Sequence, residues 1–289
     1  MSLFDGAVRT IMANADKNAA TEDAVMGEDG FLHCRVCGEA VEAELPEELK
    51  RIFHNRKTRP RMCKCARDRA DAEEVEENKR QIQYRIEELR SEGLYSVFYE
   101  DCAFSKDDRR DQRASEIARK YVEKFDEMQK DNTGLMFWGG VGTGKSYLAA
   151  CIANALIEKL HPVMMAPIQD IAAAMTENYG AHRDSILAKV ESVDLLILDD
   201  IGAERGTDYM IQQEYDIINR RCNTKKPLIV TTNLTPQQMK DKSNINRCRI
   251  FDRIEGMCLA MKVGGESRRG EIAKEKAKRF KKLLEEGDD

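Results

Sequence analysis

The 289-residue chain lacks any long hydrophobic run. No stretch approaches the roughly 18 consecutive apolar residues that a membrane-spanning helix needs, and the amino-terminal segment has no continuous apolar core like that of a signal peptide. These absences argue against a membrane-spanning or exported protein. We therefore expect a cytoplasmic protein with no membrane partner.

The chain also lacks an excess of positive charge. Its 47 Lys and Arg residues stand against 52 Asp and Glu residues, a formal net charge of −5 at pH 7. This balance argues against a simple basic protein that coats DNA, but an average says nothing about distribution. Residues 1–50 hold eleven acidic and four basic side chains, 51–69 hold one acidic and eight basic, and 266–282 hold three acidic and eight basic. Local basic surfaces are therefore compatible with the composition.

Alternating helix and strand patterns begin after residue 95. A helix is expected at 110–129, and five short apolar runs lie at 135–138, 163–166, 193–198, 228–232 and 258–263, with helix-period segments between them. Strands that are apolar throughout, with helices between them, are typical of a parallel sheet covered on both faces. The pattern predicts an α/β core domain at 95–270.

The segment before this core is nearly all charged between residues 68 and 90, and no Gly or Pro interrupts it. Four apolar residues in it are spaced like a narrow helical stripe: Val75, Ile82, Ile86 and Leu89. We predict a linker helix at 69–94, which either only connects two domains or offers a seam to a partner. A charged helical tail is expected at 271–289.

A glycine-rich octapeptide follows the predicted strand 135–138 and precedes a segment rich in Ala, Leu and Ile. It fits the pattern G-x-x-x-x-G-K-[ST], in which glycines let main-chain N–H groups turn toward phosphates and the next helix adds its dipole. Lys145 would reach the β- and γ-phosphates of ATP, and Ser146 would bind Mg²⁺. The alternative is a glycine-rich turn without a ligand. The predicted nucleotide-binding residues are Gly139, Gly140, Val141, Gly142, Thr143, Gly144, Lys145 and Ser146.

Two aspartates follow the apolar run 193–198. A parallel strand ending in Asp199 would place that carboxylate at the carboxyl edge of the sheet, where it can bind Mg²⁺. Asp200 is predicted to position or activate the attacking water, and it is one methylene shorter than Glu. Its alternative role is to cap a helix or turn, in which case Glu204 could act as the base.

In this order, the motifs resemble those of the AAA+ ATPases of the DnaC/DnaI helicase-loader group, which also includes the IstB transposition helpers. The resemblance covers about residues 94–269. It implies an AAA+ P-loop NTPase core with a parallel five-stranded sheet flanked by helices, and part of the adenine pocket near 98–104. The family's acidic pair often ends in Glu where this chain has Asp200. We therefore expect weak ATP hydrolysis, stimulated by assembly or by DNA.

The resemblance also assigns roles to polar residues after the predicted strands. Asn233, after the strand at 228–232, maps onto the sensor-one residue that contacts the γ-phosphate or the lytic water. Arg253 maps onto the arginine finger, which serves the next subunit's nucleotide, so activity would need self-association in the ATP state. Arg249 lies one turn earlier. For both arginines the alternative is a surface residue or an ordinary salt bridge.

The sensor-two arginine of the family maps onto Arg269, with Arg268 as its neighbour. Arg220 and Arg221 lie near the end of a predicted helix. We expect no role for them beyond the general preference of helix carboxyl ends for positive charge.

Four of the nine cysteines are clustered: Cys34, Cys37, Cys63 and Cys65. In a cytosolic chain, clustered cysteines more often hold a metal than form disulfides, and four thiolates can close a tetrahedral Zn²⁺ site. A domain of about 65 residues rarely gains more than 3–5 kcal/mol from its core, whereas structural zinc contributes about 10–16 kcal/mol of apparent binding energy. We predict a zinc-binding partner-docking module at 1–68 that folds only with its metal. Unbound thiols or a redox pair are the alternative.

The remaining cysteines are scattered through apolar segments, and we interpret them as small core residues: Cys102, Cys151, Cys222, Cys248 and Cys258. His33 and His54 lie near the cluster and are interpreted as bystanders. Zinc modules of this kind occur in the DnaI-type loaders, where they dock onto the replicative helicase, so the resemblance implies that partner here.

These observations predict an ATP-dependent loader of a hexameric replicative helicase onto single-stranded DNA. ATP binding and hydrolysis would be the switch, with ATP, Mg²⁺ and Zn²⁺ as cofactors. Because no motif for base-specific recognition is present, DNA contacts are expected to be to the backbone and to depend on salt. Two alternatives are an IstB-like helper that delivers a transposase and a nucleotide-sensing adaptor with little turnover.

Overall fold

The computed structural model describes residues 24–50, 57–177, 181–202, 208–240 and 245–285. Two residues named above, His54 and Glu204, lie outside these ranges. The chain divides into two compact units, Met1–Gln83 and Tyr84–Asp289. Within the described ranges, no helix is both long enough and apolar enough to cross a bilayer.

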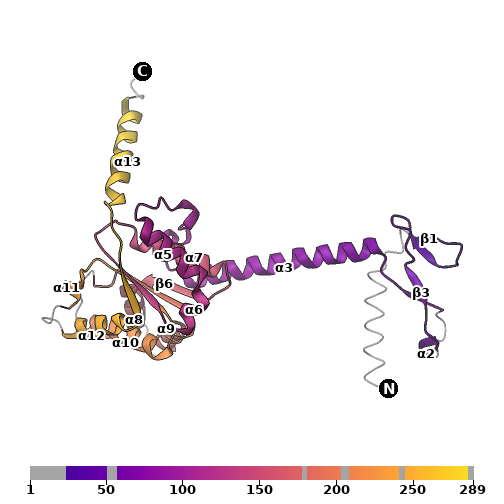
Figure 1. The fold of residues 1–289 in the computed structure, drawn as a ribbon, viewed down its shortest axis with the longest axis horizontal. Coiled ribbons are helices and arrows are strands. Elements are labelled where there is room, and N and C mark those ends of the chain that lie inside the picture. Colours follow the sequence, from indigo (N-terminus) through magenta and orange to yellow (C-terminus); the bar gives the residue numbers. More distant parts are fainter. Residues whose placement is uncertain (1–23, 51–56, 178–180, 203–207, 241–244, 286–289) are drawn as a thin grey trace. The chain divides into compact units, whose positions relative to one another are not determined.

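The first unit is built from short elements (Figure 1). Two antiparallel strand pairs, β1 with β2 and β3 with β4, are accompanied by a single-turn helix and the start of a long helix. Few of its described side chains are buried, among them Leu45, Cys34 and Cys63. The elements are β1 (Ala24–Met26), β2 (Leu32–Cys34), β3 (Glu42–Glu44), α2 (Glu47–Lys50), β4 (Thr58–Pro60) and the first part of α3 (Lys64–Gly93). So small a core fits the expectation that this unit needs another source of stability.

The predicted linker helix is present, but it begins before residue 69. The Glu39 carboxylate accepts hydrogen bonds from the main-chain N–H of Lys64, at 2.5 Å, and from the Arg67 guanidinium, at 3.0 Å. This satisfies an N–H group that the first turn of a helix leaves unpaired. Helix α3 therefore begins at Lys64 and carries Cys65 in its first turn.

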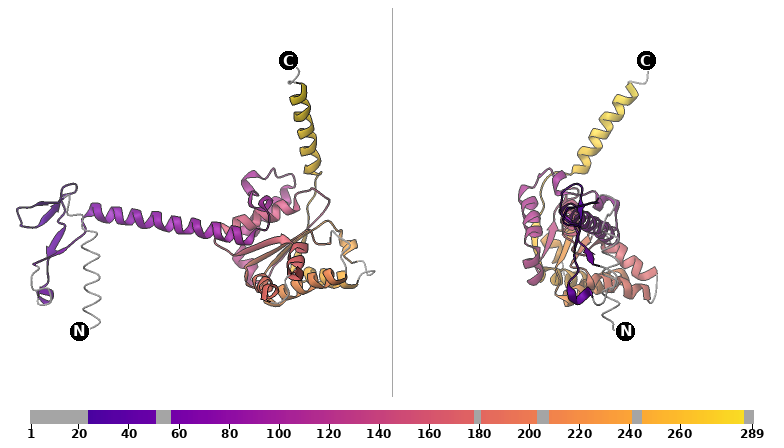
Figure 2. Two further views of the ribbon diagram at one scale, coloured as in Figure 1. Left: turned by 180° about the vertical axis from the view of Figure 1, so that it is seen from behind. Right: turned by 90° about the vertical axis from the view of Figure 1, so that its right-hand side faces the viewer.

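The second unit is a five-stranded, all-parallel sheet in the order β6-β7-β8-β5-β9. Helices cover both of its faces (Figure 2). The strands are β5 (Gly134–Trp138), β6 (Val163–Pro167), β7 (Leu195–Asp199), β8 (Leu228–Thr232) and β9 (Cys258–Lys262). The helices are α4 (Val97–Glu100), η2 (Phe104–Lys106), α5 (Gln112–Glu123), α6 (Phe125–Lys130), α7 (Lys145–Ile157), α8 (Ile168–Glu177), α9 (Ala181–Ser192), α10 (Asp208–Thr224), α11 (Pro236–Met239), α12 (Ile245–Glu255) and α13 (Arg268–Glu285). The predicted α/β class and five-stranded parallel sheet are confirmed.

The two faces of the sheet bury different side chains of the same strands. In β5, Leu135 and Phe137 pack with α5 and α7, whereas Met136 packs on the opposite face with α8, α10 and α12. Successive side chains of a strand point to opposite faces, so a strand covered on both sides is apolar at every position. This explains why the strands read as continuous apolar runs in the sequence.

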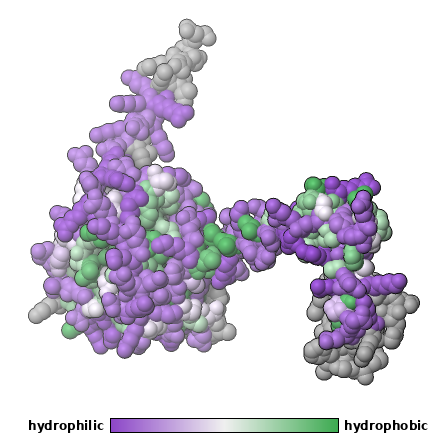
Figure 3. Space-filling view, turned by 45° about the vertical axis from the view of Figure 1, so that its right-hand side comes forward, coloured by the Kyte–Doolittle hydropathy of each residue, from purple (hydrophilic) through white to green (hydrophobic). Residues whose placement is uncertain are grey.

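Two predicted helices differ from the observed ones. The helix expected at 110–129 is divided at Lys124, whose φ of −106° and ψ of 24° end α5 before α6 begins. The helical tail begins at Arg268, so the paired arginines occupy the first turn of α13. The visible face of this helix is mostly hydrophilic (Figure 3).

Arg221 corrects an expectation. Its side chain is fully buried. Its guanidinium donates five hydrogen bonds of 2.7–3.2 Å to the main-chain carbonyls of Val190, Val193, Asp194 and Pro227. The Val190 carbonyl lies in the last turn of α9, where helix carbonyls lack intrahelical partners, and those of Val193 and Asp194 lie between α9 and β7. Burial lowers the pKa of Arg221 to about 10. Arg221 therefore holds α10 against the segment that enters β7. This is a larger role than the expected one of a positive charge at the carboxyl end of a helix.

Replacing Arg221 by Ala should lower the free energy of unfolding by about 3–5 kcal/mol, because it leaves buried carbonyls without donors. Urea denaturation followed by the fluorescence of Trp138 measures the change, since this single tryptophan lies in β5. Arg220→Ala is the matched control: Arg220 makes a partly exposed ion pair with Glu191 at 2.8 Å, and its loss should cost less than about 1 kcal/mol. Equal losses in the two variants would contradict the role of Arg221.

Candidate functional site

The glycine-rich loop joins β5 to α7 and has the shape of an anion cradle. Gly142 and Gly144 have φ values of 79° and 103°, in the left-handed region that favours glycine. A Cβ atom at Gly142 would lie 2.3 Å from the Ser267 hydroxyl oxygen. Gly144 is the N-cap of α7, and no side chain caps this helix end. Its first N–H groups are therefore available to a phosphate.

Lys145 lies at the centre of the site and is 6% exposed. Its ammonium donates hydrogen bonds to the carbonyls of Gly139, at 3.1 Å, and Gly140, at 2.7 Å, and to Asn233 Oδ1, at 2.7 Å. Burial lowers the pKa of Lys145, although the charges of Asp200 and Asp199 oppose the shift. A buried cation whose hydrogen-bond partners are all neutral suits an incoming polyanion such as a triphosphate.

The two aspartates lie where β7 ends, as the sequence predicted. Asp199 is 7% exposed, and both of its carboxylate oxygens accept hydrogen bonds, Oδ1 from the Thr231 hydroxyl at 2.5 Å and Oδ2 from the Tyr99 hydroxyl at 2.9 Å. Asp200 has a positive φ of 57°, and its main-chain N–H donates to Thr231 Oγ1 at 2.9 Å. Asp200 Oδ1 accepts from Asn233 Nδ2 at 2.8 Å. Asn233 therefore joins the Lys145 ammonium to the Asp200 carboxylate.

These groups face one cavity of 370 Å³. It is lined by Phe98, Val141, Gly142, Gly144, Lys145, Ser146, Tyr147, Asp199, Asp200, Asn233, Arg268 and Arg269. The volume is in the range of small-molecule sites. Most residues predicted to bind phosphate, Mg²⁺ and the lytic water line this cavity, which fits a nucleotide and its cation. Gly139, Gly140 and Thr143 are not among its lining residues.

Both candidate sensor-two arginines line the cavity, but their environments differ. Arg268 donates to the Asp108 carboxylate at 2.5 Å, and its guanidinium lies over the Tyr147 ring, 5.7 Å from the centroid. Arg269 is exposed, and its charge contributes to lowering the pKa of Lys145. Arg268 is thus engaged by protein groups, whereas Arg269 is exposed at the rim of the cavity.

Arg253 and Arg249 do not line this cavity. Both lie on α12, with their guanidinium carbons 5.3 Å and 5.2 Å from the centroid of the Tyr215 ring. Arg253 also donates to the Tyr215 hydroxyl at 3.1 Å and 3.3 Å. A role for Arg253 at the cavity of its own chain is therefore not supported, and its assignment as a finger for a second copy stays a prediction.

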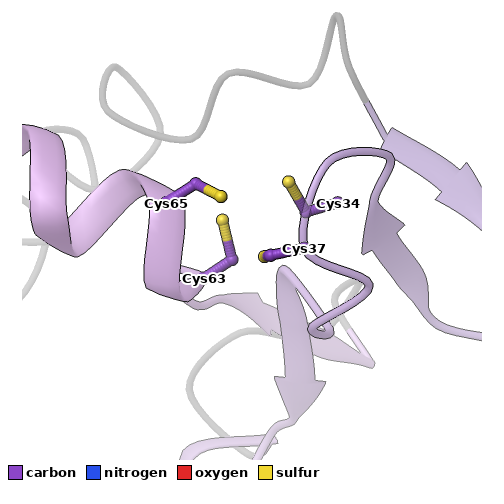
Figure 4. Close-up of side chains that lie close together, drawn as sticks. All are labelled: Cys34, Cys37, Cys63 and Cys65. Carbon is purple, nitrogen blue, oxygen red and sulfur yellow. The ribbon is translucent and has the colours of Figure 1, made fainter.

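The four clustered cysteines of the first unit come together (Figure 4). Cys34 ends β2 and Cys37 lies in the loop after it, while Cys63 directly precedes α3 and Cys65 lies in its first turn. All four Sγ atoms are within 4.8 Å of one another. None of the nine cysteines of the chain forms a disulfide. Four thiolates around a tetrahedral metal ion at about 2.3 Å would lie about 3.8 Å apart, so the cluster fits such an ion after a small contraction.

The surroundings of the cluster act differently on its thiols and engage the neighbouring His33. The main-chain N–H of Glu39 and then that of Cys65 lower the pKa of Cys37 to about 6, which favours the thiolate. The Cys37 side chain raises the pKa of Cys65 to about 11, and burial raises the pKa of Cys63. The His33 ring is occupied elsewhere, with Nε2 2.9 Å from the Asp29 carboxylate and Nδ1 2.9 Å from the Gly38 carbonyl. His33 is therefore a bystander, in agreement with the sequence analysis.

Comparison with known proteins places the chain in a family. Residues 72–277, well over half of the chain, match the family described as IstB-like ATP binding protein. The chain belongs to this family. Its membership agrees with the phosphate cradle and identifies the core as an ATP-binding P-loop NTPase domain.

Individual relatives of this IstB-like protein are replication proteins. It is 34% identical to the replicative helicase loader DnaC of Escherichia coli over 140 residues, 47% of this chain and 55% of the relative. It is 25% identical to the replicative helicase loader DnaI of Bacillus subtilis over 160 residues, 52% of this chain and 51% of the relative. The chain thus spans about half the length of these curated relatives. The predicted resemblance to the DnaC/DnaI group and to IstB is confirmed.

The fold of the second unit also has a solved counterpart. A crystal structure of DnaI superimposes with a TM-score of 0.51 at 23% identity, covering 61% of this chain and 94% of that chain. Identity this low shows a likeness of fold. The likeness agrees with the predicted five-stranded parallel core flanked by helices.

Some residues of the site were not predicted from the sequence. Nothing in the sequence marks Tyr99, which lies 100 residues before the aspartate that it contacts. Thr231 could have been noticed, because it is a polar residue at the end of an apolar run and directly precedes the Thr232-Asn233 pair. Tyr215, which holds the two arginines of α12, carries no local signal of its role.

The cysteine cluster predicts one bound metal ion per chain. Cys37→Ser should reduce the metal content from one equivalent to near zero and unfold much of the first unit, because a three-ligand remnant binds far more weakly. Elemental analysis of the purified chain and circular dichroism measure these effects. Cys222→Ser is the control, since Cys222 lies on α10 with its Sγ 3.0 Å from the Met257 sulfur. Unchanged metal content in Cys37→Ser would remove the cluster from consideration as a metal site.

Proposed function

We propose that this protein is an ATP-dependent loader that places a hexameric replicative helicase on single-stranded DNA. The observation that carries the proposal is the presence, in one chain, of a cavity lined by the glycine-rich loop and both aspartates and of a separate four-cysteine unit. Relatives named as replicative helicase loaders support it. ATP binding and hydrolysis would be the switch between the bound and released states of the helicase. Such a protein would act in the cytoplasm, where the replicative helicase works.

The cavity residues would share the work on ATP. The loop from Gly139 to Gly144 and the ammonium of Lys145 would hold the phosphates, while Ser146 and Asp199 would hold Mg²⁺. The cation would neutralise charge that develops on the phosphates. Asp200 would orient the attacking water. Its carboxylate already accepts a hydrogen bond from Asn233, which supports a shared role of these two side chains.

Arginines from outside the loop would complete the site. Arg269 would contact the phosphates from the first turn of α13, since it lines the same cavity as Lys145. Arg253 would serve the nucleotide of a second copy, because it lies on α12 and away from the cavity of its own chain. ATP hydrolysis would then require self-association in the ATP state.

The metal of the first unit would be Zn²⁺, which is typically bound by four thiolates in structural sites. Cys34, Cys37, Cys63 and Cys65 would bind it and so hold the loop against the start of α3. We propose that this module docks onto the helicase. Single-stranded DNA would be bound through its phosphates, so its affinity should fall steeply with salt.

A second candidate keeps the ATPase and changes the partner. The family match to IstB-like proteins favours a helper that delivers a transposase to target DNA. The four-cysteine unit argues for the helicase instead, because the resemblance to DnaI-type loaders connects such a module with helicase docking. A nucleotide-sensing adaptor with little turnover is the third possibility, and the subunit-mixing experiment below separates it from an ATPase.

Mixing two inactive variants tests the arginine finger. Lys145→Ala should lose nucleotide binding, and Arg253→Ala should bind ATP without hydrolysing it. In an equimolar mixture, about a quarter of the interfaces pair an intact cavity with an intact finger, so about a quarter of wild-type turnover should return. Phosphate release at high protein concentration measures it. As the control, the Arg220→Ala variant measured by itself should hydrolyse ATP at the wild-type rate. A mixture that stays inactive argues against a finger in trans, and negligible wild-type turnover favours the adaptor.

The loading function is tested with the replicative helicase of the same source. The metal-loaded chain should co-elute with the helicase and increase its unwinding of a template coated with single-strand binding protein, and only with ATP. Cys37→Ser should lose co-elution while keeping ATP binding, whereas Lys145→Ala should keep co-elution and lose loading. If the wild-type chain neither co-elutes nor stimulates unwinding, the proposed function is wrong.

A further inference from the structure

Tyr99 is a buried residue of α4 whose hydroxyl reaches the end of β7. It is 4% exposed, and its hydroxyl donates a hydrogen bond of 2.9 Å to Asp199 Oδ2. Because the Thr231 hydroxyl donates to the other oxygen, Oδ1, the Asp199 carboxylate is held from both sides. The two donors come from different elements, α4 and β8, so the orientation of the carboxylate depends on both.

The tyrosine is itself fixed by its surroundings. Asn154, a buried residue of α7, donates through Nδ2 to the main-chain carbonyls of Tyr99, at 2.7 Å, and Cys102, at 2.9 Å. The Phe98 ring packs edge-on against the Tyr99 ring, with centroids 5.8 Å apart. Asn154 Oδ1 in turn accepts from Arg90 Nε of α3 at 3.3 Å. Tyr99 is therefore anchored to the helix that follows the phosphate loop.

The hydrogen bonds of Tyr99 and Thr231 reach separate oxygens of the Asp199 carboxylate. A carboxylate fixed in this way presents its remaining lone pairs in a defined direction.

We propose that Tyr99 is a positioning residue of the magnesium site, which orients the Asp199 carboxylate toward the cation or a water bound to it. The inference rests on the proposed use of Mg²⁺–ATP and adds a residue to that site. Groups that hold a metal-binding side chain typically change metal affinity or activity by 10–100-fold when they are removed. Tyr99 differs from a ligand because it acts only through Asp199.

Tyr99→Phe removes the hydroxyl and keeps the ring. We expect this variant to bind a fluorescent ATP analogue like the wild type in the absence of divalent cations, because Tyr99 is not among the cavity-lining residues. The Mg²⁺ concentration that gives the half-maximal increase in analogue affinity should rise about tenfold. The Mg²⁺ midpoint of ATP turnover should shift in the same direction.

Tyr121→Phe is the matched control. Tyr121 is also 4% exposed, and its hydroxyl donates to the Thr133 carbonyl at 3.0 Å, away from the cavity. Both variants lose one buried hydrogen bond, so thermal unfolding should report similar losses of stability. The Mg²⁺ midpoint should change only in Tyr99→Phe, and a purely structural role of Tyr99 would leave both midpoints unchanged.

The possible outcomes distinguish a failure of the proposed function from a failure of the positioning role of Tyr99. A wild-type chain that binds no nucleotide would refute the proposed function. A wild type that binds Mg²⁺ and nucleotide, next to a Tyr99→Phe variant with the same Mg²⁺ midpoint, would refute the positioning role alone. Loss of analogue binding without Mg²⁺ in Tyr99→Phe would also refute it, because the tyrosine would then shape the nucleotide cavity.

Discussion

The site depends on the parallel register of three central strands. Leu198 of β7 pairs with Val230 of β8, which in turn pairs with Met136 of β5. Because the strands run in the same direction, the residues that follow these pairs emerge at one edge: the phosphate loop after β5, Asp199 at the end of β7, and Asn233 after β8. The hydrogen bonds of Thr231 and Asn233 then connect what the register has brought together.

Much of the second unit could be predicted from the sequence because its signals are local. A strand covered on both faces is apolar at every position, and the phosphate loop needs glycines at fixed spacing for its backbone conformation. The end of β7 follows from the same pattern, since two aspartates stop an apolar run. The clustering of Cys34, Cys37, Cys63 and Cys65 was predictable for a similar reason. Thiolates that share a metal ion are often close in the sequence as well.

Other features depend on contacts between distant segments and have no local signal. Arg221 was expected to serve a helix end, yet its five hydrogen bonds go to carbonyls whose direction is set by α9 and the turn before β8. Tyr99 and Tyr215 look like ordinary aromatic residues until the fold brings Asp199 to the Tyr99 hydroxyl and Arg253 to the Tyr215 hydroxyl. The start of α3 depended on Glu39, 25 residues earlier.

The residues after α3 also cover one edge of the sheet. β6 is an edge strand, and its outer side meets the residues after α3: Leu94 forms a parallel bridge with Met165, and the Tyr95 N–H donates to the Met165 carbonyl at 3.1 Å. Gly93 allows this close approach, since a Cβ there would lie 2.0 Å from the Val163 carbonyl oxygen. An exposed strand edge invites pairing with other chains. A shortened protein that begins after residue 95 would therefore expose an unpaired strand edge and would be prone to aggregate, even though every residue that lines the cavity would be retained.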